Sequence, residues 1–266
     1  MENWKRNYNQ ILKEICIEEN ILMKAFSYNW IFQLKKDNKT KYICGYAFDL
    51  NEMAVAQICH DKCALSDVLI DANIPCVPHH FFMDQENTKF IGINDNKESI
   101  YKLFQEYQKV VCKPNEGTSG INVILVETKE ELSIAIDTIF SKSRAMAISP
   151  YMEIKHEYRV IYLDGQIKLV YDKIRGDNWK HNLSEGTKPE IVLDQKIIEK
   201  LTKLTNDVAQ IIPFRFASVD IVEVENELMV LEVNSGVCME RFSQENKEYY
   251  QIAKDIYKEA IQKMFN

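Results

Sequence analysis

The chain has 266 residues, of which 46% are hydrophobic, so it can bury a sizeable core in one large domain or two small lobes. The net charge of −7 argues against a nucleic-acid-binding protein, and no apolar run is long enough for a membrane span or a signal peptide core. Seven scattered cysteines without a CxxC motif favour reduced thiols, so we expect a cytoplasmic protein.

The first part of the chain is expected to contain helices around a pair of strands. Residues 5–26 have a helical pattern, and "WIFQLKK" and "KYICGYAF" are predicted strands around the turn "KDNKT". Helical spacing returns from Asn51 and ends at "NIPCVP", before the extended segment "FFM". "CHDKC" could bind a metal, but no second pair of metal ligands accompanies it. Small core residues on a helix are therefore the favoured interpretation. His79 and His80 are predicted to lie in a loop or at the surface.

Short strands and helices alternate in the second part. "KVVCKP" and "INVILVE" are predicted strands, and Thr128 with Glu131 forms a capping box for a helix over 129–142. "AMAISPYM" is a further strand, followed by a hairpin with an Asp-Gly turn at 164–165 and a helix over 194–211. A last hairpin is predicted for "FASVDIVEV-ENE-LMVLEVN". This mixture favours α+β lobes over a doubly wound parallel sheet.

The last hairpin contains Glu232 within an apolar strand, where an unpaired carboxylate is costly. If its turn is the three residues "ENE", Asp220 lies directly opposite Glu232, and Asn234 lies on the same face. Two carboxylates and an amide oxygen suit Mg²⁺ or Mn²⁺, and a cation removes the repulsion between the acids. A two-residue turn moves Glu232 to the other face. Two solvated acids at a strand end are the alternative to a metal site.

The segment "KPNEGTSG", residues 113–120, can form a phosphate-binding loop. Gly117 and Gly120 allow close approach of the backbone, whose successive N–H groups can bind phosphate oxygens. The loop differs from a Walker A motif, because Lys113 precedes the glycines and no helix is expected to follow. An ordinary hairpin loop is the alternative. Lys62 is either a second phosphate contact or a surface lysine.

The order of these motifs resembles the ATP-grasp superfamily of carboxylate–amine ligases. Lys62 in "HDK", Lys113 before the glycine loop, "ISPYMEI", "SVDIV" and "LEVNSG" follow one another as in that superfamily. Residues 30–242 are similar to the group of glutathione synthetase, ribosomal-protein glutamate ligase and cyanophycin synthetase. The resemblance implies an α+β ATP-grasp fold, with two α+β lobes holding ATP between them. The expected division is a reduced N-terminal segment, a first lobe with the lid loop, and a second lobe with the metal-binding hairpin, at residues 1–60, 61–148 and 149–266.

The resemblance also implies a role for individual residues. Those implied in ATP binding are Lys62, Lys113, Gly117, Thr118, Ser119, Gly120, Ser149, Tyr151, Met152 and Glu157. Those implied in phosphoryl transfer are Arg159, Lys180 and Asn182, and those implied in metal binding are Asp220, Glu232 and Asn234. Lys180 stands where the family has an arginine. A lysine keeps the positive charge but cannot donate the two parallel hydrogen bonds of an arginine guanidinium. For Tyr151 and Met152, plain core packing is the alternative.

The implied reaction joins a carboxylate to an amine through an acyl phosphate, with ATP and two Mg²⁺ or Mn²⁺ ions. Amino acids are the expected substrates, and the acceptor is left open as a free amino acid, a peptide, a carrier protein or a protein tail. Two alternatives remain: an ATP-binding regulatory module without ligation, and a phosphotransferase that stops at phosphoryl transfer. Neither nucleic acid nor a membrane is an expected partner. A homodimer, or another partner that completes the site, stays open.

Overall fold

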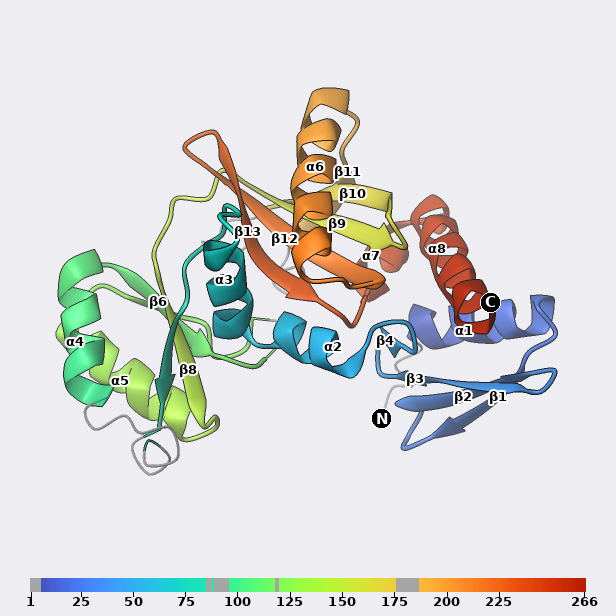
Figure 1. Ribbon diagram of the computed structural model, residues 1–266, viewed down its shortest axis with the longest axis horizontal. Helices are drawn as coiled ribbons and strands as arrows, with labels where there is room; N and C mark the ends of the chain where they lie inside the picture. Colours follow the sequence, from blue (N-terminus) through green and yellow to red (C-terminus); the bar gives the residue numbers. More distant parts are fainter. Residues whose placement is uncertain (1–5, 85–87, 89–95, 118–119, 176–186) are drawn as a thin grey trace. The chain divides into compact units, whose positions relative to one another are not determined.

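The computed structural model describes residues 6–84, 88, 96–117, 120–175 and 187–266 (Figure 1). The chain divides into two compact units. Unit 1 comprises residues 1–56, 158–220 and 234–266, and unit 2 comprises residues 57–157 and 221–233. Helices and sheets with antiparallel strand pairs are combined in the described residues, which confirms the predicted α+β class. None of the described helices is both long and apolar enough to cross a membrane.

The N-terminal part of unit 1 is a helix packed on a four-stranded sheet in the order β1-β2-β3-β4. Its elements are α1 (Asn7–Glu18), β1 (Leu22–Phe26), β2 (Ile31–Lys36), β3 (Lys39–Cys44) and β4 (Ala47–Phe48). The first strand expected here is confirmed as β2, whereas the second, expected as one strand over 41–48, is divided into β3 and β4. The prediction of a helix through residue 26 is wrong, because α1 ends at Glu18 and Asn20 takes a left-handed φ of 55°. The residues that follow pair with β2 as a strand.

A five-stranded sheet in the order β11-β10-β9-β12-β13 contributes strands to both units. Its strands are β9 (His156–Leu163), β10 (Gln166–Ile174), β11 (Lys188–Ile191), β12 (Phe216–Val224) and β13 (Glu227–Asn234). The Asp-Gly turn between β9 and β10 is confirmed, with φ of 44° at Asp164 and 85° at Gly165. Positive φ at both central residues matches the twist of a two-residue hairpin.

The turn between β12 and β13 differs from the predicted three-residue turn. β12 ends at Val224 and β13 begins at Glu227, so only Glu225 and Asn226 lie between them. Both have positive φ, 51° and 68°, which is the backbone of a two-residue type I′ turn. The inferred pairing of Asp220 with Glu232 therefore loses its basis.

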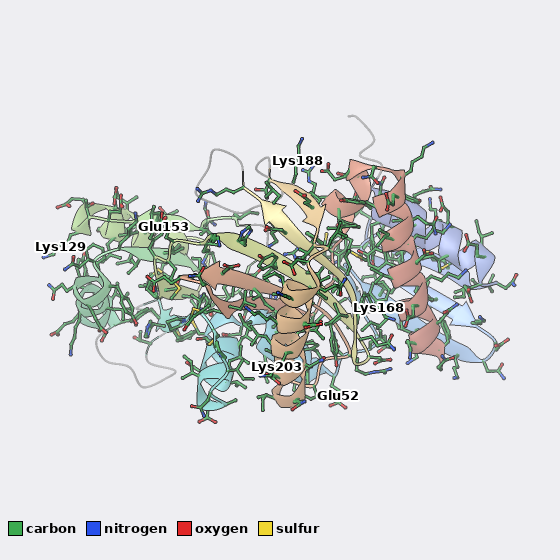
Figure 2. The ribbon with its side chains drawn as sticks, turned by 90° about the horizontal axis from the view of Figure 1, so that it is seen from above. Glu52, Lys129, Glu153, Lys168, Lys188 and Lys203 are labelled. Carbon is green, nitrogen blue, oxygen red and sulfur yellow. The ribbon has the colours of Figure 1, made fainter. Side chains whose placement is uncertain are left out.

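Three helices complete unit 1: α6 (Gln195–Ile211), α7 (Glu240–Glu245) and α8 (Lys247–Phe265). The predicted helix over 194–211 is confirmed as α6, with Asp194 as its N-cap. The core of unit 1 joins α1, α8 and the inner sides of both sheets, and Phe32, Tyr171 and Tyr257 are among its buried residues. Lys168 on β10, labelled in Figure 2, adds a surface ion pair with Glu259 of α8 at 2.8 Å.

Unit 2 is a second α+β body around the sheet β5-β8-β6-β7. Its strands are β5 (His80–Met83), β6 (Val110–Pro114), β7 (Ile124–Val126) and β8 (Ala145–Pro150), and its helices are α3 (Lys62–Asp71), α4 (Asn96–Tyr107) and α5 (Lys129–Phe140). Helix α2 (Met53–His60) begins in unit 1 and ends in unit 2. The capping box of Thr128 and Glu131 is confirmed at the start of α5. Cys59 and Cys63 are buried on α2 and α3, as the core interpretation predicts. The proposed three-segment division of the chain stays a prediction.

Candidate active site

Lys62 is held at the start of α3 against the first residues of the glycine loop. Asp61 caps α3 by accepting a hydrogen bond from the Ala64 N–H at 2.8 Å. The Lys62 ammonium donates to the carbonyls of Gly117, at 3.0 Å, and Asn115, at 3.4 Å. Lys62 is buried rather than a surface lysine, so the surface alternative is wrong. Its charge lies beside a loop whose backbone can approach a phosphate.

Lys113 in β6 is a second buried lysine of unit 2. Burial lowers its pKa from 10.5 to about 8; the carboxylate of Glu232 acts in the opposite direction, and the charge of Lys62 lowers it further. Glu157 also raises this pKa. Unit 2 therefore brings together Lys62, Lys113, Glu157 and Glu232, four residues that the sequence predicts for ATP or metal binding. A buried ammonium with a depressed pKa is typical of a functional site.

His79 adds a neutral group to the same neighbourhood; it lies in a loop, as predicted, but its side chain is buried. It is 3% exposed, and neither ring nitrogen has a hydrogen-bond partner within the described residues. Burial lowers its pKa well below 6.5, and the charges of Lys113 and Lys62 add to this effect. The sequence gives no signal for its burial, because "CVPHH" has the composition of a loop.

The predicted adenine hinge spans the end of β8 and the residues directly after it. Ser149 is buried, whereas Tyr151 and Met152 are half-buried. The Tyr151 N–H donates to the Lys109 carbonyl at 2.9 Å, and the Lys109 ammonium lies 4.1 Å from the centre of the Tyr151 ring. These contacts fix the course of the chain after β8. The roles of Ser149, Tyr151 and Met152 in binding adenine stay predictions.

Unit 1 contains a buried cluster around the carboxylate of Asp220. Arg159 donates to both carboxylate oxygens, each at 2.7 Å, and the Lys173 ammonium lies 3.0 Å from Oδ2. Burial by itself raises the pKa of Asp220, but the charges of Arg159 and Lys173 outweigh it and hold the pKa well below its usual range. Asp220 is therefore ionised, and a bidentate arginine and a lysine balance its charge.

Lys173 is a candidate residue that the sequence analysis missed. It is 5% exposed and lies in β10, next to the Tyr171–Asp172 stretch of the same buried strand. A lysine inside the apolar run "KLVYDKI" is the same kind of signal as the glutamate inside "LMVLEV". This signal is present in the sequence, but Lys173 belongs to none of the motifs that carry the family resemblance.

Several predicted residues cannot be placed. Thr118, Ser119, Lys180 and Asn182 lie outside the described residues. Gly117 and Gly120 flank the undescribed part of the loop, and Gly120 has a φ of 66°. Asn234 is half-buried and ends β13. The metal role of Asp220, Glu232 and Asn234 stays a prediction. Among the described side chains, no group of three His, Cys, Asp or Glu suited to a metal occurs.

Residues 59–259 match the family described as the RimK-like ATP-grasp domain. The chain belongs to this family. It is 25% identical over 225 residues to a protein of Methanocaldococcus jannaschii named tetrahydromethanopterin:alpha-L-glutamate ligase, covering 75% of this chain and 76% of that one. The predicted ATP-grasp membership and ATP-dependent ligase activity are therefore confirmed.

Solved structures agree on the fold of this RimK-like chain. D-alanine–D-alanine ligase of Bacillus anthracis superposes with a TM-score of 0.61 at 19% identity, over 82% of this chain and 72% of that chain. D-alanyl-alanine synthetase A of Vibrio cholerae superposes with a TM-score of 0.68 at 13% identity, over 98% and 93% of the two chains. At these identities the likeness shows the ATP-grasp fold alone.

Proposed function

We propose that this chain uses ATP and Mg²⁺ to join a carboxylate to the amine of an amino acid through an acyl phosphate. The observation that carries the proposal is a set of buried cations in a member of this ligase family. Lys62 and Lys113 lie beside the glycine loop in unit 2, and Arg159 and Lys173 surround Asp220 in unit 1. Such groups suit phosphate, whose charge offsets the cost of burying them.

The reaction has two steps. The substrate carboxylate attacks the γ-phosphorus of ATP, forming an acyl phosphate and releasing ADP. The amine then attacks the acyl carbon, loses a proton and displaces inorganic phosphate. No protein nucleophile is needed, so the chain contributes position and charge. We assign binding of the ATP phosphates to Lys62 and Lys113. Arg159 and Lys180 are assigned to neutralise the negative charge of the transferring phosphoryl group.

The metal is assigned to Asp220, Glu232 and Asn234 because of the family motif and their ligand chemistry, and not because of the cross-strand pairing, whose basis the two-residue turn removes. Their carboxylate and amide oxygens are ligands that Mg²⁺ prefers, and Asp220 is ionised because of its depressed pKa. When bound, Mg²⁺ supplies positive charge to the β- and γ-phosphates. Asp220 is already neutralised by Arg159 and Lys173, so these two side chains must share it with the metal or move toward phosphate.

The amine substrate is proposed to be an α-amino acid, with L-glutamate as the first candidate. The relative from M. jannaschii is named as an α-L-glutamate ligase, and the two structural neighbours described above are named for joining alanine. Candidate acids include amino acids, peptides and carrier-bound carboxylates. We place the reaction in the cytoplasm.

The proposal is tested by measuring ADP and phosphate release from Mg-ATP with panels of acids, each with and without amines, and by mass spectrometry of products. A ligase releases both products and forms an amide only when acid and amine are present. A phosphotransferase forms ADP and a stable phosphorylated acid without an amine. ATP binding without turnover across all pairs, including glutamate, contradicts ligation and supports a regulatory module.

Replacing Lys113 with methionine is expected to weaken Mg-ATP binding and to stabilise the fold. Loss of a charge-assisted phosphate contact costs roughly 1.5–3 kcal/mol, about 10- to 100-fold in Kd. The same change removes a buried ammonium whose pKa is lowered from 10.5 to about 8. Below pH 8, its removal is expected to raise the free energy of unfolding by up to roughly 3 kcal/mol. Calorimetry and thermal unfolding measure both effects.

The matched control is Lys203→Met on the exposed side of α6, labelled in Figure 2. It should change neither the Kd nor the melting temperature measurably. A Lys113→Met protein that binds Mg-ATP as tightly as the wild type contradicts the phosphate assignment.

Nucleotide binding is expected to take up a proton near pH 8. At this pH about half of the Lys113 side chains are neutral in the free protein, because the pKa is about 8. A bound triphosphate raises this pKa, so binding takes up about 0.5 proton at pH 8 and close to none at pH 6.5. Calorimetry in buffers of different protonation enthalpy gives the number directly. In Lys113→Arg, which stays charged, the uptake should vanish; equal uptake there places the proton on another group.

A further inference from the structure

The sheet β1-β2-β3-β4 in unit 1 has one face on the core and one face open to solvent. Phe32, Leu34 and Ile43 point inward and are at most 2% exposed. Because side chains alternate along a strand, the residues between them point outward. The strand register adds β1 to the same face, since Leu22 pairs with Lys35 and Lys24 pairs with Gln33. We call this surface the basic sheet face, formed by Leu22, Lys24, Phe26, Gln33, Lys35 and Tyr42.

Large apolar side chains are unusually exposed on and beside the basic sheet face. Leu22 is 76% exposed, Phe26 39% and Tyr42 45%. The loop that joins β1 to β2 adds Tyr28 and Trp30, at 106% and 50%. A cluster of exposed aromatic and aliphatic groups in a water-facing sheet indicates a surface that is covered by a partner.

The outer edge of this sheet is formed by β1. Within the described part of the chain, β1 pairs with β2 on one side and with no strand on the other (Figure 1). Its second side therefore presents backbone N–H and C=O groups that an extended polypeptide can bind as an added strand. Nucleic acid and lipid lack the backbone amides that complete such an edge.

The charge of this segment is opposite to that of the whole chain. Residues 22–44 contain lysines at positions 24, 35, 36, 39 and 41 and a single acidic residue, Asp37, whereas the chain as a whole has a net charge of −7. Lys36 and Lys41 form ion pairs with Glu19 and Asp49, at 3.5 and 3.2 Å. On the outward face, Lys24 lies 5.1 Å from the centre of the Phe26 ring.

We propose that the basic sheet face binds an extended acidic peptide of a partner protein, which pairs with the free side of β1. Cross-strand neighbours then place an acidic side chain opposite Lys24 and apolar side chains opposite Leu22 and Phe26. A second copy of this chain is a poor occupant. Antiparallel pairing of two β1 strands about their centre puts Lys24 opposite the Lys24 of the partner subunit, and like charges repel there.

The test uses the full chain and a blocked nine-residue peptide in which leucine, glutamate and phenylalanine occupy alternate positions, separated by threonine. Calorimetry should detect binding that weakens with salt. A peptide with lysine in place of the glutamate should bind at least about fivefold more weakly. In Lys24→Glu the preference should reverse, with ATP turnover unchanged.

The matched control is Lys188→Glu, an exposed lysine on the edge strand β11 of the other sheet, labelled in Figure 2. It should leave the peptide preference as in the wild type. Three results overturn the proposal: no binding of the glutamate peptide at millimolar concentration, equal preferences in wild type and Lys24→Glu, or tighter binding of single-stranded nucleic acid through Lys24. Sedimentation that shows dimers broken by Lys24→Glu, with no peptide binding, assigns the edge to a second copy instead. None of these readouts requires ligation.

Discussion

Replacing Asp220 with asparagine is expected to lower the free energy of unfolding by about 3–5 kcal/mol, which corresponds to a fall in melting temperature of roughly 6–20 °C. The carboxylate is 1% exposed and balances both Arg159 and Lys173, at 2.7 and 3.0 Å. Asparagine keeps the size of the side chain but removes its charge. Arg159 and Lys173 then lose the ionised group that both of them contact, and burial of a less well balanced charge is costly.

The chain offers a matched control in Asp164→Asn. Asp164 also binds an arginine through both oxygens, with Arg215 at 2.8 and 2.9 Å. This pair is at the surface, since the Arg215 side chain is 48% exposed, so its loss should cost no more than about 1 kcal/mol. Asparagine also tolerates the positive φ at this turn position. Equal melting temperatures for the two variants contradict a stabilising cluster around Asp220.

The cluster also changes the physical account of the acidic hairpin. From the sequence, two facing carboxylates repel each other unless a metal binds them or water solvates both at the strand end. In the structure Asp220 is relieved by Arg159 and Lys173 instead, while Glu232 interacts with Lys113. The charge balance of each acid therefore comes from a different part of the chain. Loss of the Asp220 charge is therefore expected to weaken the fold.

Elements with strong local signals were predictable from the sequence. The Asp-Gly turn, the capping box at Thr128 and the strand before the glycine loop all follow from short stretches of residues, and the structure confirms them. The motif order indicated the family, because five weak motifs in one order are far more specific than any of them alone.

Features that depend on distant or unusual contacts were not predictable. Glu225 takes a left-handed φ, which non-glycine residues other than asparagine and aspartate seldom adopt, so the two-residue turn had no clear signal. Strand β1 has five residues and becomes a strand through pairing with β2, whereas its sequence continues the helical pattern of α1. The partners of Lys173 and the surroundings of His79 are also set by packing alone.

Replacing Glu232 with glutamine is expected to reduce ATP turnover at least about 100-fold while changing the free energy of unfolding by less than about 1 kcal/mol. Glu232 is half-buried, and its carboxylate interacts with the buried ammonium of Lys113, which can release its proton when that attraction is lost, so the cost to the fold stays small. The large effect falls on turnover because the carboxylate is assigned to the metal. Steady-state ADP release and thermal unfolding of the same preparation separate the two effects.

Two further measurements make the assignment of Glu232 specific. Binding of Mn²⁺ in the presence of ADP, followed by electron paramagnetic resonance, should weaken in Glu232→Gln and stay unchanged in Glu227→Gln, an exposed position on the same strand. Because Glu232 raises the pKa of Lys113, that pKa should also fall below about 8 in Glu232→Gln. The affinity for nucleotide should then fall more at pH 8 than at pH 6.5. If the variant unfolds at a lower temperature but binds Mn²⁺ normally and turns over ATP at the wild-type rate, Glu232 has a structural role. The metal assignment is then wrong.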